Sequence, residues 1–304
     1  MKKTEKIILI IFIVFGGAAF LFSPFKQLID VHSVPQVAGQ NFSPLPVVAV
    51  TRPVKRAEVG EFTTDAAVAY AIDLKSGAVL ADINGRVKWP TASLAKLMTA
   101  QVVFNVTSVG EEVVIKQEDL KVDAPVMGLE AGEKIAIIDL LRGMLISSAN
   151  DAANVLASSV AGDQERFAEL MNLMAKQFGL DDTHFKNSMG FDDPEQYATA
   201  RDMASLAQNF LKNKDLAEMA GTKTMEVRST DGTKRHWLKN SNKLLEDKNI
   251  HGVKTGYTDA ALGNLILLVE DNAGNKILTV IFGSLQREVD SRALVDWVFD
   301  SYDF

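Results

Sequence analysis

The order of the expected elements constrains the fold more than any other feature, because strands lie at both ends of the chain and helices lie between them. Two strand-like runs joined by a Lys75-Ser76-Gly77 turn come first, and three more, with a hairpin loop at 271–275, come near the C-terminus. Helical patterns fill the middle, and one more closes the chain. This order predicts an α+β domain whose antiparallel sheet is completed by the C-terminal strands. The expected strands are 66–73, 78–83, 252–257, 264–270 and 276–282, and the expected helices are 140–146, 151–160, 164–178, 199–212 and 289–299.

Composition narrows the function classes. A chain of 304 residues with 47% hydrophobic residues can bury a full-sized core. Its formal net charge of -7 argues against a nucleic-acid partner, which normally requires a basic face. The absence of cysteine excludes disulfides and thiolate metal sites, and the four histidines lack the spacing of metal ligands.

The first 25 residues predict a membrane anchor or a signal segment. Lys2, Lys3 and Lys6 precede an apolar run at 7–22 that has no polar face. The run is somewhat shorter than the roughly 20 residues that span a bilayer and longer than the roughly 7–15 of a signal peptide core. We expect an uncleaved, single-pass anchor in the cell membrane, with the lysines in the cytoplasm and the rest of the chain outside. Secretion after signal cleavage is the alternative.

Residues 26–61 predict a linker, since they contain four prolines and little periodicity. The folded domain is then expected at 62–304.

The stretch 89–100 predicts the start of a helix that carries a reactive pair. Pro90 and Thr91 would supply the stop and the cap. Ser93 and Lys96 stand one turn apart, so their side chains project from the same side and could act as a nucleophile and its base.

Two further polar motifs follow, each in a suitable setting. Ser148-Ala149-Asn150 lies at a break between helices, and Lys254-Thr255-Gly256 lies in a strand that leads into a hairpin. Each motif is weak alone, and Ser23-Pro24-Phe25-Lys26 is a second chance match to SxxK. The ordered combination SxxK, SxN, KTG is the informative signal.

That trio, together with segments 187–191, 199–204 and 254–261 and the opening hairpin at 72–81, resembles the D-alanyl-D-alanine carboxypeptidases, the low-molecular-mass penicillin-binding proteins. The likeness extends over about 63–299. It implies a β-lactamase/transpeptidase-like fold, in which an antiparallel sheet is flanked by helices and joined by a helical subdomain. It also implies that 62–304 is a penicillin-binding catalytic domain.

The resemblance implies an acyl-enzyme on Ser93, formed on the carbonyl between the two terminal D-alanines of a peptidoglycan stem peptide. Lys96 is the expected base, and burial, the helix start and the charge of Lys254 should lower its pKa. Ser148 is expected to relay a proton to the leaving amine. Asn150 is expected to orient Lys96 and the substrate amide.

The same resemblance assigns substrate binding to four adjacent positions. Lys254 and Thr255 would hold the terminal carboxylate. Gly256 would let the strand approach the substrate, and the N–H groups of Ser93 and Tyr257 would form the oxyanion hole. Neither a metal nor an organic cofactor is implied, and β-lactams are the expected covalent inhibitors.

Three departures keep other functions open. Ala149 stands where class A β-lactamases have aspartate, and Tyr257 stands where many of these carboxypeptidases have histidine. The third departure is that the resembling region reaches nearly to the last residue, so the C-terminal β-rich domain that many relatives have is expected to be missing. A D,D-endopeptidase that cleaves cross-links is therefore the first alternative. A β-lactamase comes next, although the acidic residues between the motifs, Asp192, Asp193 and Glu195, are expected to be solvated. A non-catalytic penicillin-binding sensor is the third.

Overall fold

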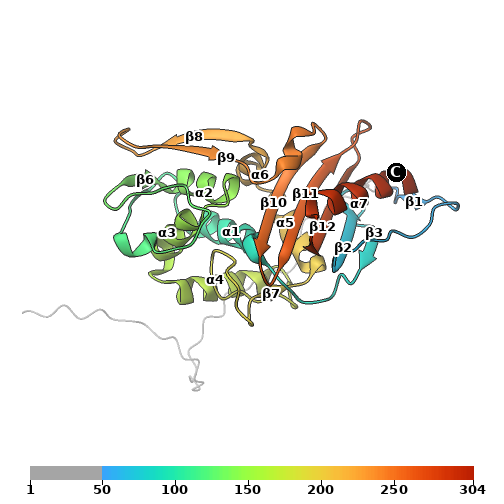
Figure 1. The fold of residues 1–304 in the computed structure, drawn as a ribbon, viewed down its shortest axis with the longest axis horizontal. Coiled ribbons are helices and arrows are strands. Elements are labelled where there is room, and N and C mark those ends of the chain that lie inside the picture. Colours follow the sequence, from blue (N-terminus) through green and yellow to red (C-terminus); the bar gives the residue numbers. More distant parts are fainter. Residues whose placement is uncertain (1–49) are drawn as a thin grey trace, which may run out of the picture. The chain divides into compact units, whose positions relative to one another are not determined.

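The computed structural model describes residues 50–304 (Figure 1). The expected anchor at 1–25 and most of the expected linker lie outside the described residues. Among the helices of the described part, none is both long enough and apolar enough to cross a bilayer.

A five-stranded antiparallel sheet forms the centre of the domain (Figure 1). Its order is β10-β11-β12-β2-β3, so the last strand of the chain's C-terminal group, β12, pairs with the first strand of the opening hairpin. The predicted antiparallel sheet and both predicted hairpins are confirmed. The strands are β2 (Val68–Asp73), β3 (Val79–Ile83), β10 (Ile250–Thr258), β11 (Leu262–Glu270) and β12 (Lys276–Ser284).

Both faces of the sheet are covered, which explains the nearly continuous apolar strands. Alternate side chains of β12 pack into two different hydrophobic cores. Leu278, Val280 and Phe282 belong to the core on the first face, and Ile277 and Ile281 belong to the core on the second face. Helix α7 (Arg287–Ser301) covers the second face. The first face packs against α5 (Ala200–Leu211) and the segment that carries Ser93.

Helices beside the sheet form the helical part (Figure 1). Most of the predicted bounds agree with the structure to within about three residues. Thr199 caps α5 as predicted, since its side chain accepts a hydrogen bond from the Asp202 N–H. The helices are α1 (Lys96–Val106), α2 (Ile137–Ile146), α3 (Asn150–Ala161) and α4 (Gln164–Gln177).

The prediction that Thr91 caps the Ser93 helix is wrong. Thr91 itself has helical backbone angles, so its hydroxyl is not directed at the first free N–H groups and makes no hydrogen bond within the described residues. The helix instead begins with a 3-10 turn, η1 (Ala92–Ala95). Buried Asn264 of β11 holds the entry, because its amide donates to the carbonyls of Pro90 and Thr91.

The structure contains several elements beyond those that the sequence predicts. The main ones are α6 (Lys214–Gly221) and a hairpin of β8 (Thr224–Arg228) and β9 (Arg235–Lys239). This hairpin lies over α2, at the upper edge of Figure 1. The remaining short elements are β1 (Val54–Lys55), β4 (Trp89–Pro90), β5 (Glu112–Val114), η2 (Gln117–Leu120), β6 (Lys134–Ala136), β7 (Tyr197–Ala198), η3 (Lys243–Glu246) and β13 (Tyr302–Asp303).

Candidate active site

Ser93 lies in a tightly constrained turn at the junction of the sheet and the helices. Ala92 has a φ of 46°, a left-handed value that a residue with a side chain rarely adopts. Gly190 packs against this turn with a φ of 91°, and a Cβ there would overlap the Ala92 carbonyl. Left-handed residues of this kind cluster at functional sites, where surrounding contacts hold them in place.

Lys96 is completely buried, and its amine is surrounded by three oxygens. Nζ lies 3.0 Å from Oγ of Ser93, 2.7 Å from Oδ1 of Asn150 and 2.6 Å from the carbonyl oxygen of Met189. The amide and the carbonyl can only accept from this amine. When the amine is neutral, they take its two hydrogens and leave its lone pair directed at the Ser93 hydroxyl. The arrangement suits a base that removes the Ser93 proton.

The electrostatics favour the neutral form. Burial, followed by the charge of Lys254, holds the pKa of Lys96 well below 10.5. Burial, followed by the charge of Arg287, lowers the pKa of Lys254 to about 7. Burial and the repulsion from Lys254 therefore act in the direction that the sequence analysis expected.

The second and third motifs meet through Lys254 and Ser148. Nζ of Lys254 donates to Oγ of Ser148 at 2.8 Å, although the two residues are 106 positions apart. Ser148 has a φ of 60°, so it is the second left-handed residue with a side chain at the site, after Ala92. Oγ1 of Thr255 lies 2.7 Å from Oγ of Ser241, which follows strand β9.

Gly256 brings strand β10 against the reactive turn. A Cβ at this position would lie 3.0 Å from Cβ of Ala92 and 3.1 Å from the Ser93 nitrogen. Only glycine therefore allows this backbone approach without a shift of the neighbours. The Gly256 carbonyl accepts a 2.7 Å hydrogen bond from the Arg287 guanidinium. The Tyr257 side chain is exposed, so its ring takes no part in this packing.

Direct contacts join the predicted residues of the three motifs in two groups. Ser93, Lys96 and Asn150 form one, Ser148 and Lys254 form the other, and the close approach of Gly256 to Ser93 links the KTG strand to the first. Sequence reasoning missed the Met189 carbonyl, because a main-chain acceptor leaves no residue-type signal. It also missed Ser241 and Arg287, whose separation from the motifs along the chain hides their contacts with Thr255 and Gly256.

Comparisons with solved structures place this fold among the DD-peptidases and penicillin-binding proteins. A D-alanyl-D-alanine carboxypeptidase from Mycobacterium tuberculosis superposes with a TM-score of 0.74 at 26% identity, covering 81% of this chain and 95% of that one. A Streptomyces DD-transpeptidase gives a TM-score of 0.74 at 26% identity, covering 80% of this chain and 100% of that one.

The family model for D-alanyl-D-alanine carboxypeptidase matches residues 54–285, so the chain belongs to this family. Among curated relatives, the carboxypeptidase DacF of Bacillus subtilis is 32% identical over an alignment of 254 residues, and the match covers 80% of this chain. The same match covers 64% of DacF, so the chain spans less than two thirds of that relative's length.

Proposed function

We propose that this protein is a serine-type D-alanyl-D-alanine carboxypeptidase that removes the terminal D-alanine from peptidoglycan stem peptides. The observation that carries the proposal is the contact between the buried, low-pKa amine of Lys96 and the Ser93 hydroxyl. Family membership supplies the substrate class. The residues alone support acyl transfer in general.

In the proposed acylation, Lys96 takes the Ser93 proton while Oγ attacks the carbonyl carbon between the two D-alanines. The tetrahedral intermediate collapses with cleavage of the C–N bond, and Ser148 relays the proton held by Lys96 to the departing amine, so that Lys96 is neutral again. Free D-alanine leaves, and the rest of the stem peptide remains as an ester on Ser93. Water then attacks the ester carbonyl and loses a proton to Lys96. The bond to Oγ of Ser93 breaks, Oγ takes that proton from Lys96, and the shortened peptide leaves. The same first step accounts for covalent inhibition by β-lactams.

Substrate selection is proposed to come from strand β10. Lys254 and Thr255 bind the terminal carboxylate, which restricts the enzyme to free C-termini. The N–H groups of Ser93 and Tyr257 stabilise the oxyanion, and the close approach at Gly256 supports this role.

The test uses the full chain with a stem pentapeptide and, separately, with a cross-linked peptide dimer. We expect release of free D-alanine from the pentapeptide and stable labelling by a fluorescent penicillin. Ser93→Ala should abolish both signals, and Ser23→Ala, the chance SxxK match, should change neither. Cleavage of the dimer alone would establish an endopeptidase, and rapid loss of the label would indicate a β-lactamase. Stable labelling without any hydrolysis would favour the sensor.

We also propose that 1–25 anchors the protein in the cell membrane, with the catalytic domain outside. The support is the apolar run at 7–22 behind three lysines. The full chain should stay in the membrane fraction after alkaline carbonate extraction. Recovery of a shortened chain in the medium, with a new N-terminus, would show a cleaved signal instead.

A further inference from the structure

Asn150, which contacts Lys96, is itself held by the loop between η2 and β6. Its side-chain Nδ2 donates to the Asp123 carbonyl at 2.8 Å, and its backbone N–H donates to the Pro125 carbonyl at 2.7 Å. The first of these bonds determines which end of the amide faces Lys96. With Nδ2 committed to a carbonyl of the loop, Oδ1 is the atom left to accept from the amine.

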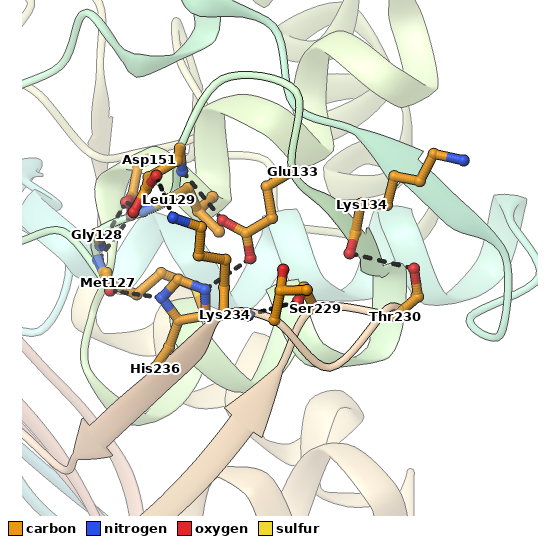
Figure 2. Close-up of polar contacts among 12 residues, drawn as sticks. Met127, Gly128, Leu129, Glu133, Lys134, Asp151, Ser229, Thr230, Lys234 and His236 are labelled. Carbon is orange, nitrogen blue, oxygen red and sulfur yellow. Dashed lines mark hydrogen bonds and ion pairs between the residues drawn. The ribbon is translucent and has the colours of Figure 1, made fainter.

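The next residue, Asp151, holds the same loop. Asp151 is 2% exposed, and its carboxylate accepts from the N–H groups of Met127, Gly128 and Leu129 at 2.9, 3.0 and 3.2 Å (Figure 2). A buried carboxylate without hydrogen bonds would be strongly unfavourable, so its stability depends on these loop amides remaining in place. Asn150 thus attaches the start of α3 to residues 123–125 of the loop, and Asp151 attaches it to residues 127–129.

The β8–β9 hairpin secures the loop from the other side. Nδ1 of buried His236 lies 3.2 Å from the Met127 carbonyl, and its Nε2 lies 2.7 Å from a carboxylate oxygen of buried Glu133 (Figure 2). The second Glu133 oxygen accepts from the Glu130 N–H at 3.0 Å. Since a carbonyl can only accept, Nδ1 is the ring nitrogen that donates to Met127, and Nε2 faces the Glu133 carboxylate.

The geometry points to Asp151 and the His236–Glu133 pair as positioning residues for the proposed reaction: they hold loop 123–129, the loop orients Asn150, and Asn150 directs the Lys96 lone pair at Ser93. None of the three needs to touch the substrate. The β8–β9 hairpin, which lies outside the central sheet, thereby becomes part of the catalytic apparatus. The expected effect of these residues on the acylation rate rests on the proposed function.

Four substitutions in the full chain test the inference. Asp151→Asn replaces one accepting oxygen with a donor that faces the loop N–H groups. Glu133→Ala leaves Nε2 of His236 without its partner. Glu133→Gln is the conservative rescue, because its amide can donate to Nε2 of a neutral His236 and still accept from Glu130. Glu130→Gln is the matched control, since it removes the same charge three positions away, at an exposed side chain whose ion pair with Lys234 of the hairpin lies at the surface and should contribute little.

Two measurements are made on each variant: the acylation rate with a fluorescent penicillin and the pKa of Lys96 by NMR of its side chain. Loosening the loop should admit water to Lys96 and raise its pKa toward the usual value, with Lys254 still facing it. We expect Asp151→Asn and Glu133→Ala to slow acylation at pH 7 by about tenfold to a hundredfold and to raise the Lys96 pKa. Both control and rescue should stay within about twofold of the wild-type rate.

A merely structural role predicts a different result. If folded Asp151→Asn and Glu133→Ala proteins lose thermal stability but keep the wild-type Lys96 pKa and acylation rate, the inference is overturned. Glu133→Ala decides the matter if Asp151→Asn does not fold. If the wild-type protein is not acylated, the proposed function is refuted but this inference is not. The Lys96 titration still reports whether these residues position the amine.

Discussion

At the residue scale, the site depends on two buried lysines whose charged forms are disfavoured. Lys96 and Lys254 are 0% and 1% exposed, and burial is the largest cause of the lowered pKa of each. A lysine whose pKa is lower in the folded protein binds fewer protons than in the unfolded chain. Stability therefore rises with pH between the two pKa values and is lowest below the folded one.

Lys254→Met should stabilise the protein, and more so at low pH. The pKa of Lys254 falls from 10.5 to about 7. At about 1.4 kcal/mol for each pKa unit, this lowered pKa costs the folded state roughly 5 kcal/mol at pH 6 and roughly 1–2 kcal/mol at pH 9.5. The lost hydrogen bonds lower stability similarly at both pH values. In urea unfolding, the change in the free energy of unfolding caused by Lys254→Met should therefore be about 3 kcal/mol more stabilising at pH 6 than at pH 9.5. An effect independent of pH would refute a lowered pKa.

Lys96→Arg tests whether the amine must be neutral. A guanidinium keeps its charge at any accessible pH, so it cannot take the Ser93 proton. We expect penicillin acylation to slow by about 10²–10⁴-fold, the usual contribution of a general base. Stopped-flow acylation at several pH values is the measurement, and the wild-type rate should rise with pH through the Lys96 pKa. Lys88→Arg, at an exposed lysine, is the control.

At the element scale, strand β10 is placed by one glycine. Gly256→Ala should force β10 away from η1, because the added Cβ would lie 3.0 Å from Ala92 and 3.1 Å from the Ser93 nitrogen. We expect at least a tenfold slower acylation together with a lower melting temperature. Gly110→Ala is the matched control, since a Cβ there meets no atom within 4 Å. Equal effects of the two substitutions on acylation would mean that the close approach is unimportant.

Also at this scale, the central sheet and most helices could be predicted from the sequence because their apolar periodicity reflects burial. The β8–β9 hairpin has a weaker signal, because it packs on α2 outside that sheet and leaves Trp237 71% exposed. Asp231-Gly232 at its turn is the local pattern that indicates it. The three motifs located the candidate site, but the loop that holds Asn150 depends on contacts between distant segments, which local patterns do not encode.

At the scale of the whole molecule, Asn264 connects the sheet to the entry of the Ser93 helix. Its amide donates to Pro90 and Thr91, and its Oδ1 accepts from the Gly283 N–H at 3.1 Å. Asn264→Leu would leave these buried main-chain groups unpaired, so we expect a loss of about 2–4 kcal/mol in the free energy of unfolding.

Chemical denaturation measures this loss, with Asn105→Leu as the comparison, because Asn105 is exposed and its side chain donates to the Gln101 carbonyl within α1. A loss below about 0.5 kcal/mol for Asn264→Leu would show that the sheet and the helix entry are held by other contacts.

The complete burial of Lys96 has a consequence for chemical selectivity. A neutral amine is a stronger intrinsic nucleophile than an alcohol, and direct attack by it would trap the enzyme as a stable amide. Because Lys96 is enclosed behind Ser93, only the alcohol can meet an incoming electrophile. In the proposed reaction the product would therefore be a labile ester, and burial of Lys96 would prevent self-inactivation through an amide.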